Sequence, residues 1–231
     1  KAVVPYLILQ IYYKKKCFQE LLNYIHEVSS AELFLKNEDE ISLLVAEAYF
    51  FTGNYATAAK HYEEYIAHKD FVVTSEILYR TAYAFYQAKG THKALKYFKE
   101  LALQEDAMGQ AASYYAGILY TKTNQKKLAL AAFDKAQKAH FCTDIQEEAA
   151  FQYIRVCYDL GNFTAVIKKI QKFRQVHTAS RRLAEINVLL AEAYFRTRDY
   201  DLAIVHIEEL NPQSQYMLEI YQKVTFYKGC E

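Results

Sequence analysis

The side chains that could bind a metal ion or attack a substrate are seven histidines and four cysteines. His61 and His68 stand seven residues apart, a spacing that would place both imidazoles on one face of a helix. Two ligands do not make a zinc site, because zinc takes at least three protein ligands. The cysteines form no Cys-x-x-Cys motif, and no histidine stands near Cys157 in the sequence to activate it. The sequence therefore predicts no metal ion and no cofactor.

Acid–base chemistry needs two carboxyl groups that face each other, and the paired glutamates do not offer that arrangement. Glu63–Glu64, Glu147–Glu148 and Glu208–Glu209 are adjacent in the sequence. Neighbouring residues of a helix point about 100° apart, so such pairs are typical of a solvated helix face. The chain also lacks a His-Glu-x-x-His motif and a glycine-rich phosphate loop. It is therefore predicted not to be an enzyme.

The composition favours an all-α protein. The 231 residues include only six glycines and two prolines, whereas a β-rich chain needs many tight turns and more of both. The net charge is +1 and the only dense basic run is Tyr12–Lys16, which argues against a nucleic-acid partner. No apolar run reaches the roughly 18 residues of a membrane-spanning helix, so no direct membrane span is expected.

One phrase occurs twice in the chain. Residues Ala46–Ala58 are AEAYFFTGNYATA, and residues Ala191–Ala203 are AEAYFRTRDYDLA. The tyrosine of AEAYF, which is Tyr49 in one copy and Tyr194 in the other, serves as a marker. Its equivalents recur at intervals of 37, 36, 35, 37 and 37 residues, at Tyr12, Tyr49, Phe85, Tyr120, Cys157 and Tyr194. A period of this length is typical of a solenoid of repeated helical units.

Each period carries the same spacing of small and large apolar residues. A small or aliphatic residue stands three before the marker and another nine after it, and a large apolar residue follows four later. Offsets of three and four place side chains on one helix face, and turn residues such as Gly53 and Gly161 separate two such segments. Each unit is therefore predicted to be a helix, a tight turn and a second helix. The small residues at the predicted helix crossings should be buried: Ala58, Ala94, Ala129 and Ala203.

This pattern resembles the tetratricopeptide repeat, which has a small residue, a tyrosine, a glycine, an aromatic, an alanine and a phenylalanine at similar offsets. The resemblance implies an all-α, right-handed superhelical solenoid of antiparallel helix pairs. It implies a single domain over residues 1–231, which we expect to be a fragment of a longer protein. The six predicted units and a further helix are 2–38, 39–74, 75–109, 110–146, 147–183, 184–212 and 213–231.

The spacing of 35–37 residues exceeds the 34 that is common in the family. In this it is loosely similar to bacterial envelope proteins of the TolA-binding and outer-membrane-assembly lipoprotein type. On that resemblance, a bacterial periplasmic or envelope location is favoured over the cytoplasm.

By the geometry of the family, the first helix of each pair lines a concave groove that holds a protein or peptide partner. Leu43 and Glu47 are expected there. Tyrosine and arginine often dominate binding hot spots, and the middle of the chain is rich in both. The predicted groove residues are Phe50, Tyr79, Arg80, Tyr83, Tyr86, Tyr115, Gln152, Arg155 and Tyr158. For any single ring among them, packing between repeat units explains the residue as readily as partner binding does.

Some members of the family clamp a C-terminal carboxylate with lysine at the fifth and asparagine at the ninth position of a unit. Here Tyr6 and Leu43 stand at fifth positions, and Gln10 and Glu47 at ninth positions, so a chaperone-tail receptor is not expected. The leading hypothesis is a non-enzymatic scaffold that binds a protein or peptide. Two alternatives stay open: a structural module that acts by self-association, and a regulatory segment of a larger signalling protein.

The last predicted helix carries apolar residues that a following helix would cover. The face expected to be exposed comprises Ile207, Leu210, Met217, Ile220, Tyr221 and Val224. Exposed apolar patches of several hundred Å² tend to find partners. The sequence therefore predicts a weak homodimer through the C-terminal helix.

Overall fold

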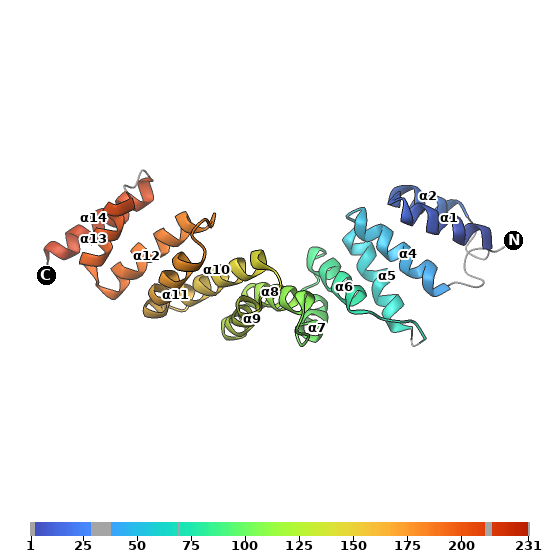
Figure 1. Ribbon diagram of the computed structural model, residues 1–231, viewed down its shortest axis with the longest axis horizontal. Coiled ribbons are helices and arrows are strands. Elements are labelled where there is room, and N and C mark those ends of the chain that lie inside the picture. Colours follow the sequence, from blue (N-terminus) through green and yellow to red (C-terminus); the bar gives the residue numbers. More distant parts are fainter. Residues whose placement is uncertain (1–2, 29–37, 69, 211–213, 231) are drawn as a thin grey trace. The chain divides into compact units, whose positions relative to one another are not determined.

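The computed structural model describes residues 3–28, 38–68, 70–210 and 214–230, and in these ranges it contains helices and no strands (Figure 1). The chain divides into two compact units, Lys1–Ala112 and Ser113–Glu231. The helices of the first unit are α1 (Val3–Lys14), α2 (Phe18–Glu27), α4 (Glu38–Phe51), α5 (Tyr55–Ala67), α6 (Ser75–Gln87) and α7 (Thr91–Leu101). Helix α8 (Ala107–Lys122) begins before residue 112 and ends after it. The helices that follow are α9 (Lys126–Lys138), α10 (Thr143–Asp159), α11 (Phe163–Val176), α12 (Leu183–Thr197), α13 (Tyr200–Leu210) and α14 (Gln215–Gly229).

Within each unit, helices that follow one another in the sequence pack together. In the first unit α5 packs against both α4 and α6, and α6 packs against α7. In the second unit α10 packs against α9 and α11, and α12 packs against α11 and α13. The all-α helical repeat fold predicted from the sequence is therefore confirmed. The division into six units within one domain stays a prediction.

The turn inside each helix pair has one conformation throughout the chain. The residue four after each marker has a positive φ: Lys16, Gly53, Lys89, Asn124, Gly161 and Arg198. The N–H of the next residue donates to the carbonyl of the marker, for example from Asn54 to Tyr49 over 2.9 Å. This pattern is a Schellman C-cap, which satisfies carbonyls that a helix end leaves without a partner.

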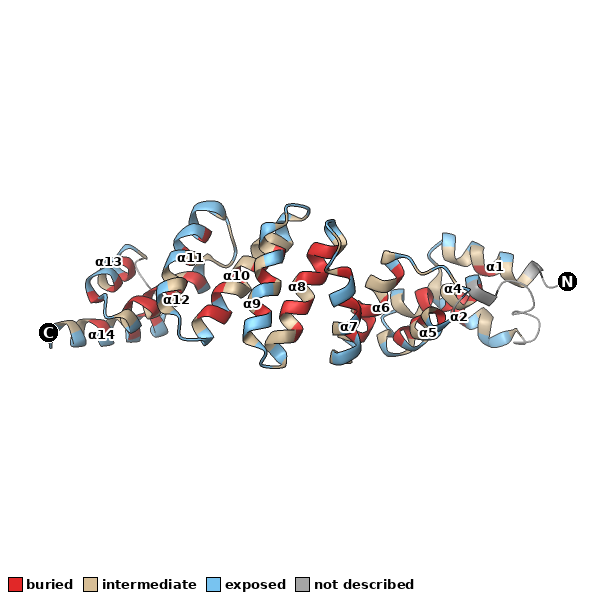
Figure 2. Ribbon diagram, turned by 90° about the horizontal axis from the view of Figure 1, so that it is seen from below, coloured by how far each residue is buried: buried red, intermediate tan, exposed pale blue. Residues whose placement is uncertain are grey.

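The helix crossings are closed by small residues, as predicted. Ala58, Ala94, Ala129 and Ala203 are all 0% exposed. At Gly117 the helices approach still more closely, because an added Cβ would lie 2.6 Å from a ring carbon of Phe133. In Figure 2 buried residues are coloured red, and they occur along the helices of both units. The apolar cores of both units therefore follow the repeat pattern read from the sequence.

The expectation of an exposed apolar face on α13 and α14 is wrong for most of its residues. Ile207, Met217, Ile220 and Val224 are at most 5% exposed. Helix α14 packs against both α12 and α13, and this docking covers the face that a further helix would otherwise fill. The apolar side chains that α14 leaves exposed lie on its other side and include Leu218 and Phe226. Self-association through this helix stays a prediction and would have to use that other side.

The last predicted element lies partly outside the described residues. The predicted further helix, 213–231, is observed as α14, but its first and last residues are not described. Pro212, which precedes it, is not described either. None of the described helices is both long enough and apolar enough to cross a membrane.

Candidate functional site

A cavity of about 480 Å³ lies in the first compact unit, among α1, α4 and α6. Each of these is the first helix of a predicted repeat. Four of its lining residues are the fifth and ninth positions of two successive predicted units, namely Tyr6, Gln10, Leu43 and Glu47. The remaining lining residues are Tyr13, Lys14, Glu40, Leu44, Thr74, Glu76, Ile77 and Arg80. Equivalent positions of consecutive units thus meet at one hollow, because each first helix turns the same face towards it.

Glu47 is held at the base of this cavity by three hydrogen-bond donors. Its side chain is only 3% exposed. The hydroxyl of Tyr62 donates to Oε1 over 2.7 Å, and the hydroxyl of Tyr13 donates to Oε2 over 3.3 Å. The guanidinium of Arg80 donates to Oε2 and forms the ion pair. We expected Glu47 to face a groove; it lines the cavity, and it is also a buried acceptor that ties α1, α5 and α6 to α4.

The electrostatics of this cluster favour a charged Arg80 beside neutral tyrosines. Burial and then the Glu47 carboxylate raise the pKa of Tyr62 above its ordinary value, and the same causes raise the pKa of Tyr13. Burial lowers the pKa of Arg80, but its hydrogen bond to Glu47 and the charge of Glu47 raise that pKa by more. Both hydroxyls therefore stay protonated and act as donors over the ordinary pH range.

Arg80 also joins the cavity to a cluster of aromatic rings. It pairs with Glu76 one turn earlier on α6, and its guanidinium carbon lies 5.3 Å from the centre of the Phe51 ring. Phe50, on α4, lies 6.0 Å from Tyr83 of α6, measured between ring centres.

Tyr83 in turn contacts two further rings of α6, Tyr79 at 6.4 Å and Tyr86 at 6.1 Å. All four of these rings are half-buried. The five site residues predicted in the first unit, Phe50, Tyr79, Arg80, Tyr83 and Tyr86, therefore lie together. The structure makes each of these rings a packing residue as well as a candidate contact.

The four predicted site residues of the second unit come from α8 and α10. Tyr115 lies 5.3 Å from the neighbouring Tyr114 ring, and Gln152 donates to Glu148 over 3.0 Å. Arg155 is exposed and lies 4.0 Å from Glu185.

Tyr158 packs its ring 5.4 Å from that of Phe163. Burial, and then a hydrogen bond to Glu192, raise the pKa of Tyr158 to about 12. These residues contribute no side chain to the first-unit cavity. Whether they form a groove with the residues of the first unit stays a prediction.

Sequence reasoning missed an ion pair that joins α10 to the start of α12. The Arg182 guanidinium donates to both carboxylate oxygens of Glu148, over 2.9–3.1 Å, and lies 4.6 Å from the Phe151 ring. The only signal in the sequence was a separation of 34 residues, close to one repeat. The same near-repeat separation of 33 residues relates Glu47 to Arg80. An acidic and a basic residue about one repeat apart in the sequence can therefore indicate a contact between the first helices of successive repeats.

The histidines that could have suggested a metal site take part in ring contacts instead. The rings of His61 and Tyr49 stack at 5.4 Å, and those of His68 and Phe71 stack at 4.2 Å. Among the described residues, no group of three or more His, Cys, Asp or Glu side chains is placed to hold a metal ion.

Comparison with solved structures identifies the fold as that of tetratricopeptide repeat proteins. A tetratricopeptide repeat protein from Parabacteroides merdae matches with a TM-score of 0.60 over 98% of this chain and 86% of its own, at 15% sequence identity. MamA from Desulfovibrio magneticus, residues 41 to the end, matches with a TM-score of 0.59 over 82% of this chain and 98% of its own, at 17% identity. No family model and no curated protein sequence matches the chain.

Proposed function

We propose that this chain is a non-enzymatic scaffold that binds a peptide segment of a protein partner, and that the cavity among α1, α4 and α6 is a contact site. The observation that carries the proposal is that this cavity is built from equivalent positions of successive first helices. Scaffolds of the tetratricopeptide repeat fold offer that helix as a binding face, and the likeness of fold supports the same use here.

The lining of the cavity supports a mixed apolar and charged ligand. Tyr6, Leu43 and Leu44 are partly exposed and offer an apolar wall. Three carboxylates and two cations also line it, but Glu47 and Arg80 are engaged with each other. The exposed Glu40 is then a candidate partner for a basic side chain of the ligand. We infer a peptide that inserts one apolar side chain and places a lysine or arginine at the rim.

Affinity measurements with peptides selected against the chain from a random display library would test this proposal. The two test variants are Leu43→Asp, which places a charge in the apolar wall, and Tyr6→Ala, which removes a ring from it. Each is expected to weaken binding by at least about tenfold, as loss of a hot-spot contact does. The matched control is Lys60→Ala on α5, an exposed residue that does not line the cavity.

Thermal unfolding followed by circular dichroism shows whether the variants remain folded. The proposal is rejected if well-folded Leu43→Asp and Tyr6→Ala proteins bind the selected peptides as tightly as the parent. It is also rejected if Lys60→Ala weakens binding as much as they do, because the peptides would then occupy another face.

A further inference from the structure

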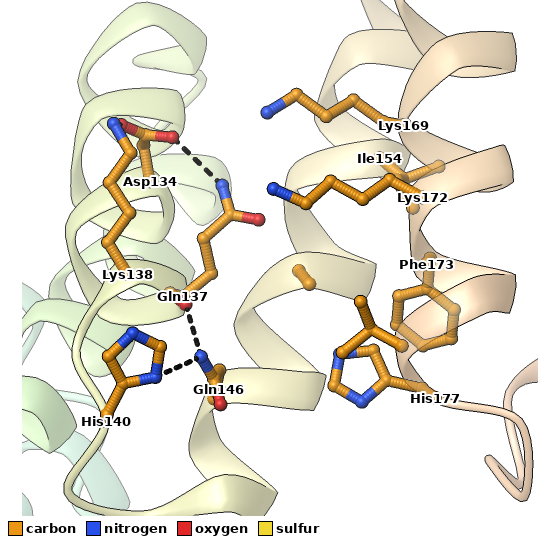
Figure 3. Close-up of a pocket in the computed structure, with 12 residues that line it drawn as sticks. Asp134, Gln137, Lys138, His140, Gln146, Ile154, Lys169, Lys172, Phe173 and His177 are labelled. Carbon is orange, nitrogen blue, oxygen red and sulfur yellow. Dashed lines mark hydrogen bonds and ion pairs between the residues drawn. The ribbon is translucent and has the colours of Figure 1, made fainter.

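A second cavity, of about 310 Å³, lies wholly within the second unit, between α9 and α11 and above α10 (Figure 3). None of the predicted site residues lines it. Its lining residues are Asp134, Gln137, Lys138, His140, Gln146, Ala150, Ile154, Lys169, Lys172, Phe173, Val176 and His177. Helices α9 and α11 are second helices of their pairs, so the cavity is distinct from the face proposed above for peptide binding.

The charges around this cavity are unbalanced. Three lysines line it, against the single carboxylate of Asp134. That carboxylate is already occupied, because Lys138 donates to Oδ2 over 2.5 Å and Gln137 donates to Oδ1 over 3.0 Å. Among the ion pairs within 4.0 Å in the described part of the chain, none includes Lys169 or Lys172.

The two unbalanced lysines extend into the same space. Figure 3 shows both side chains running from α11 towards Gln137 on α9. Lys169 rests its ammonium group 4.5 Å from the centre of the Tyr153 ring, a contact that holds the cation in place without neutralising it. The two ammonium groups repel each other in this partly enclosed space. A bound anion would attract both of them and offset that repulsion.

Of the other polar groups of the cavity, Gln146 and His140 are positioned by hydrogen bonds, and Nδ1 of His177 lies 3.6 Å from the Glu147 carboxylate. The Gln146 side-chain amide nitrogen lies 3.0 Å from both the backbone carbonyl oxygen of Gln137 and Nδ1 of His140. With the amide donating to Nδ1, the His140 proton is on Nε2, which makes that nitrogen a donor. Ile154 and Phe173 are buried beneath these groups and give the cavity an apolar floor. Convergent donors above an apolar floor are typical of a small-ligand site.

We propose that this cavity binds a phosphate group, with Lys169 and Lys172 as the two charge partners. A phosphate monoester carries about −1.5 to −2 charges at neutral pH, which matches two ammonium groups. Lysine binds phosphate as a point charge, and the second negative charge of a phosphate, which a carboxylate lacks, has a partner in the second lysine. The candidate sources of the phosphate group are a phosphorylated residue of a protein and inorganic phosphate.

NMR titration of the ¹⁵N-labelled chain would test this proposal. The probes are inorganic phosphate, a short peptide with one phosphoserine, and the same peptide with glutamate at that position, all at constant ionic strength because salt screens exposed charges. The test variant is Lys169→Gln/Lys172→Gln. The control is Lys168→Gln/Lys223→Gln, which removes two exposed lysines that do not line the cavity from the same unit and leaves the net charge equal to that of the test variant.

We expect saturable shifts of α9, α10 and α11 amides with a phosphate probe, and a loss of affinity of at least about tenfold in the test variant but not in the control. Tighter binding of the phosphopeptide than of inorganic phosphate assigns the source to a protein, and the reverse assigns it to the free ion. The proposal is overturned if no phosphate probe gives saturable shifts there, if the two double variants bind alike, or if the glutamate peptide binds as tightly as the phosphopeptide. None of these outcomes depends on the first-unit cavity.

Discussion

The ion pair between Glu47 and Arg80 offers a sharp test of how the first unit is held together. Arg80→Met keeps much of the side-chain volume and removes the charge. The substitution breaks two ion pairs that differ in burial. The side chain of Glu47 is 3% exposed, and that of Glu76 is 58% exposed. The two pairs should therefore contribute very different free energies.

The magnitude follows from the burial of each carboxylate. An exposed pair four residues apart on one helix contributes about 0.3–0.5 kcal/mol. A buried charge left without its partner costs about 3–5 kcal/mol. The hydroxyls of Tyr13 and Tyr62 remain as donors to Glu47, so the lower end of that range is the better expectation. Arg80→Met should thus lower the free energy of unfolding by about 3 kcal/mol.

Urea unfolding followed by circular dichroism measures this effect, and amide hydrogen exchange in α4 and α6 locates it. Glu76→Gln is the matched control and should cost less than about 0.5 kcal/mol. The double variant Glu47→Gln/Arg80→Met should be more stable than Arg80→Met alone, since no uncompensated charge remains buried. A loss below about 1 kcal/mol for Arg80→Met would refute the reasoning, because the pair would then behave as an exposed one.

Two further predictions concern single residues. Lys89 has a φ of +61°, a conformation that costs a non-glycine residue about 1–2 kcal/mol, so Lys89→Gly should raise the free energy of unfolding by about 0.5–1 kcal/mol after the entropy of glycine is subtracted. Urea unfolding measures this gain, and an unchanged or lower stability would contradict it. The pKa of Tyr62 is higher in the folded chain than in the unfolded chain, so its contribution to stability is complete below about pH 10 and is lost as the pH rises further. The stability of Tyr62→Phe should therefore fall less steeply above that pH than the stability of the parent, and equal slopes would contradict the assignment.

The sequence alone was sufficient for the parts of the structure that depend on local spacing. The recurrence of small residues around each marker predicted the helix pairs, and it also predicted the burial of Ala58 and Ala94. Such features follow from the sequence because helix periodicity determines which side chains share a face. The turns were predicted less completely. The φ > 0 position is Gly53 in one pair, a glycine as expected, but it is the non-glycine residue Lys89 in another.

The tertiary structure decided which polar side chains meet and which apolar faces are covered. Glu47 was expected at a groove, but the packing of α1, α5 and α6 around α4 buries it against donors from three other helices. The apolar face of α14 was expected to be exposed, but the helix docks on α12 and α13 and covers it. Likewise, the lysines of α11 became a candidate site only because the packing of α9 and α10 beside them encloses a cavity. Such contacts depend on the angle and the distance between helices. The repeat period determines neither quantity, because it specifies which face of each helix is apolar and not which side chains that face will contact.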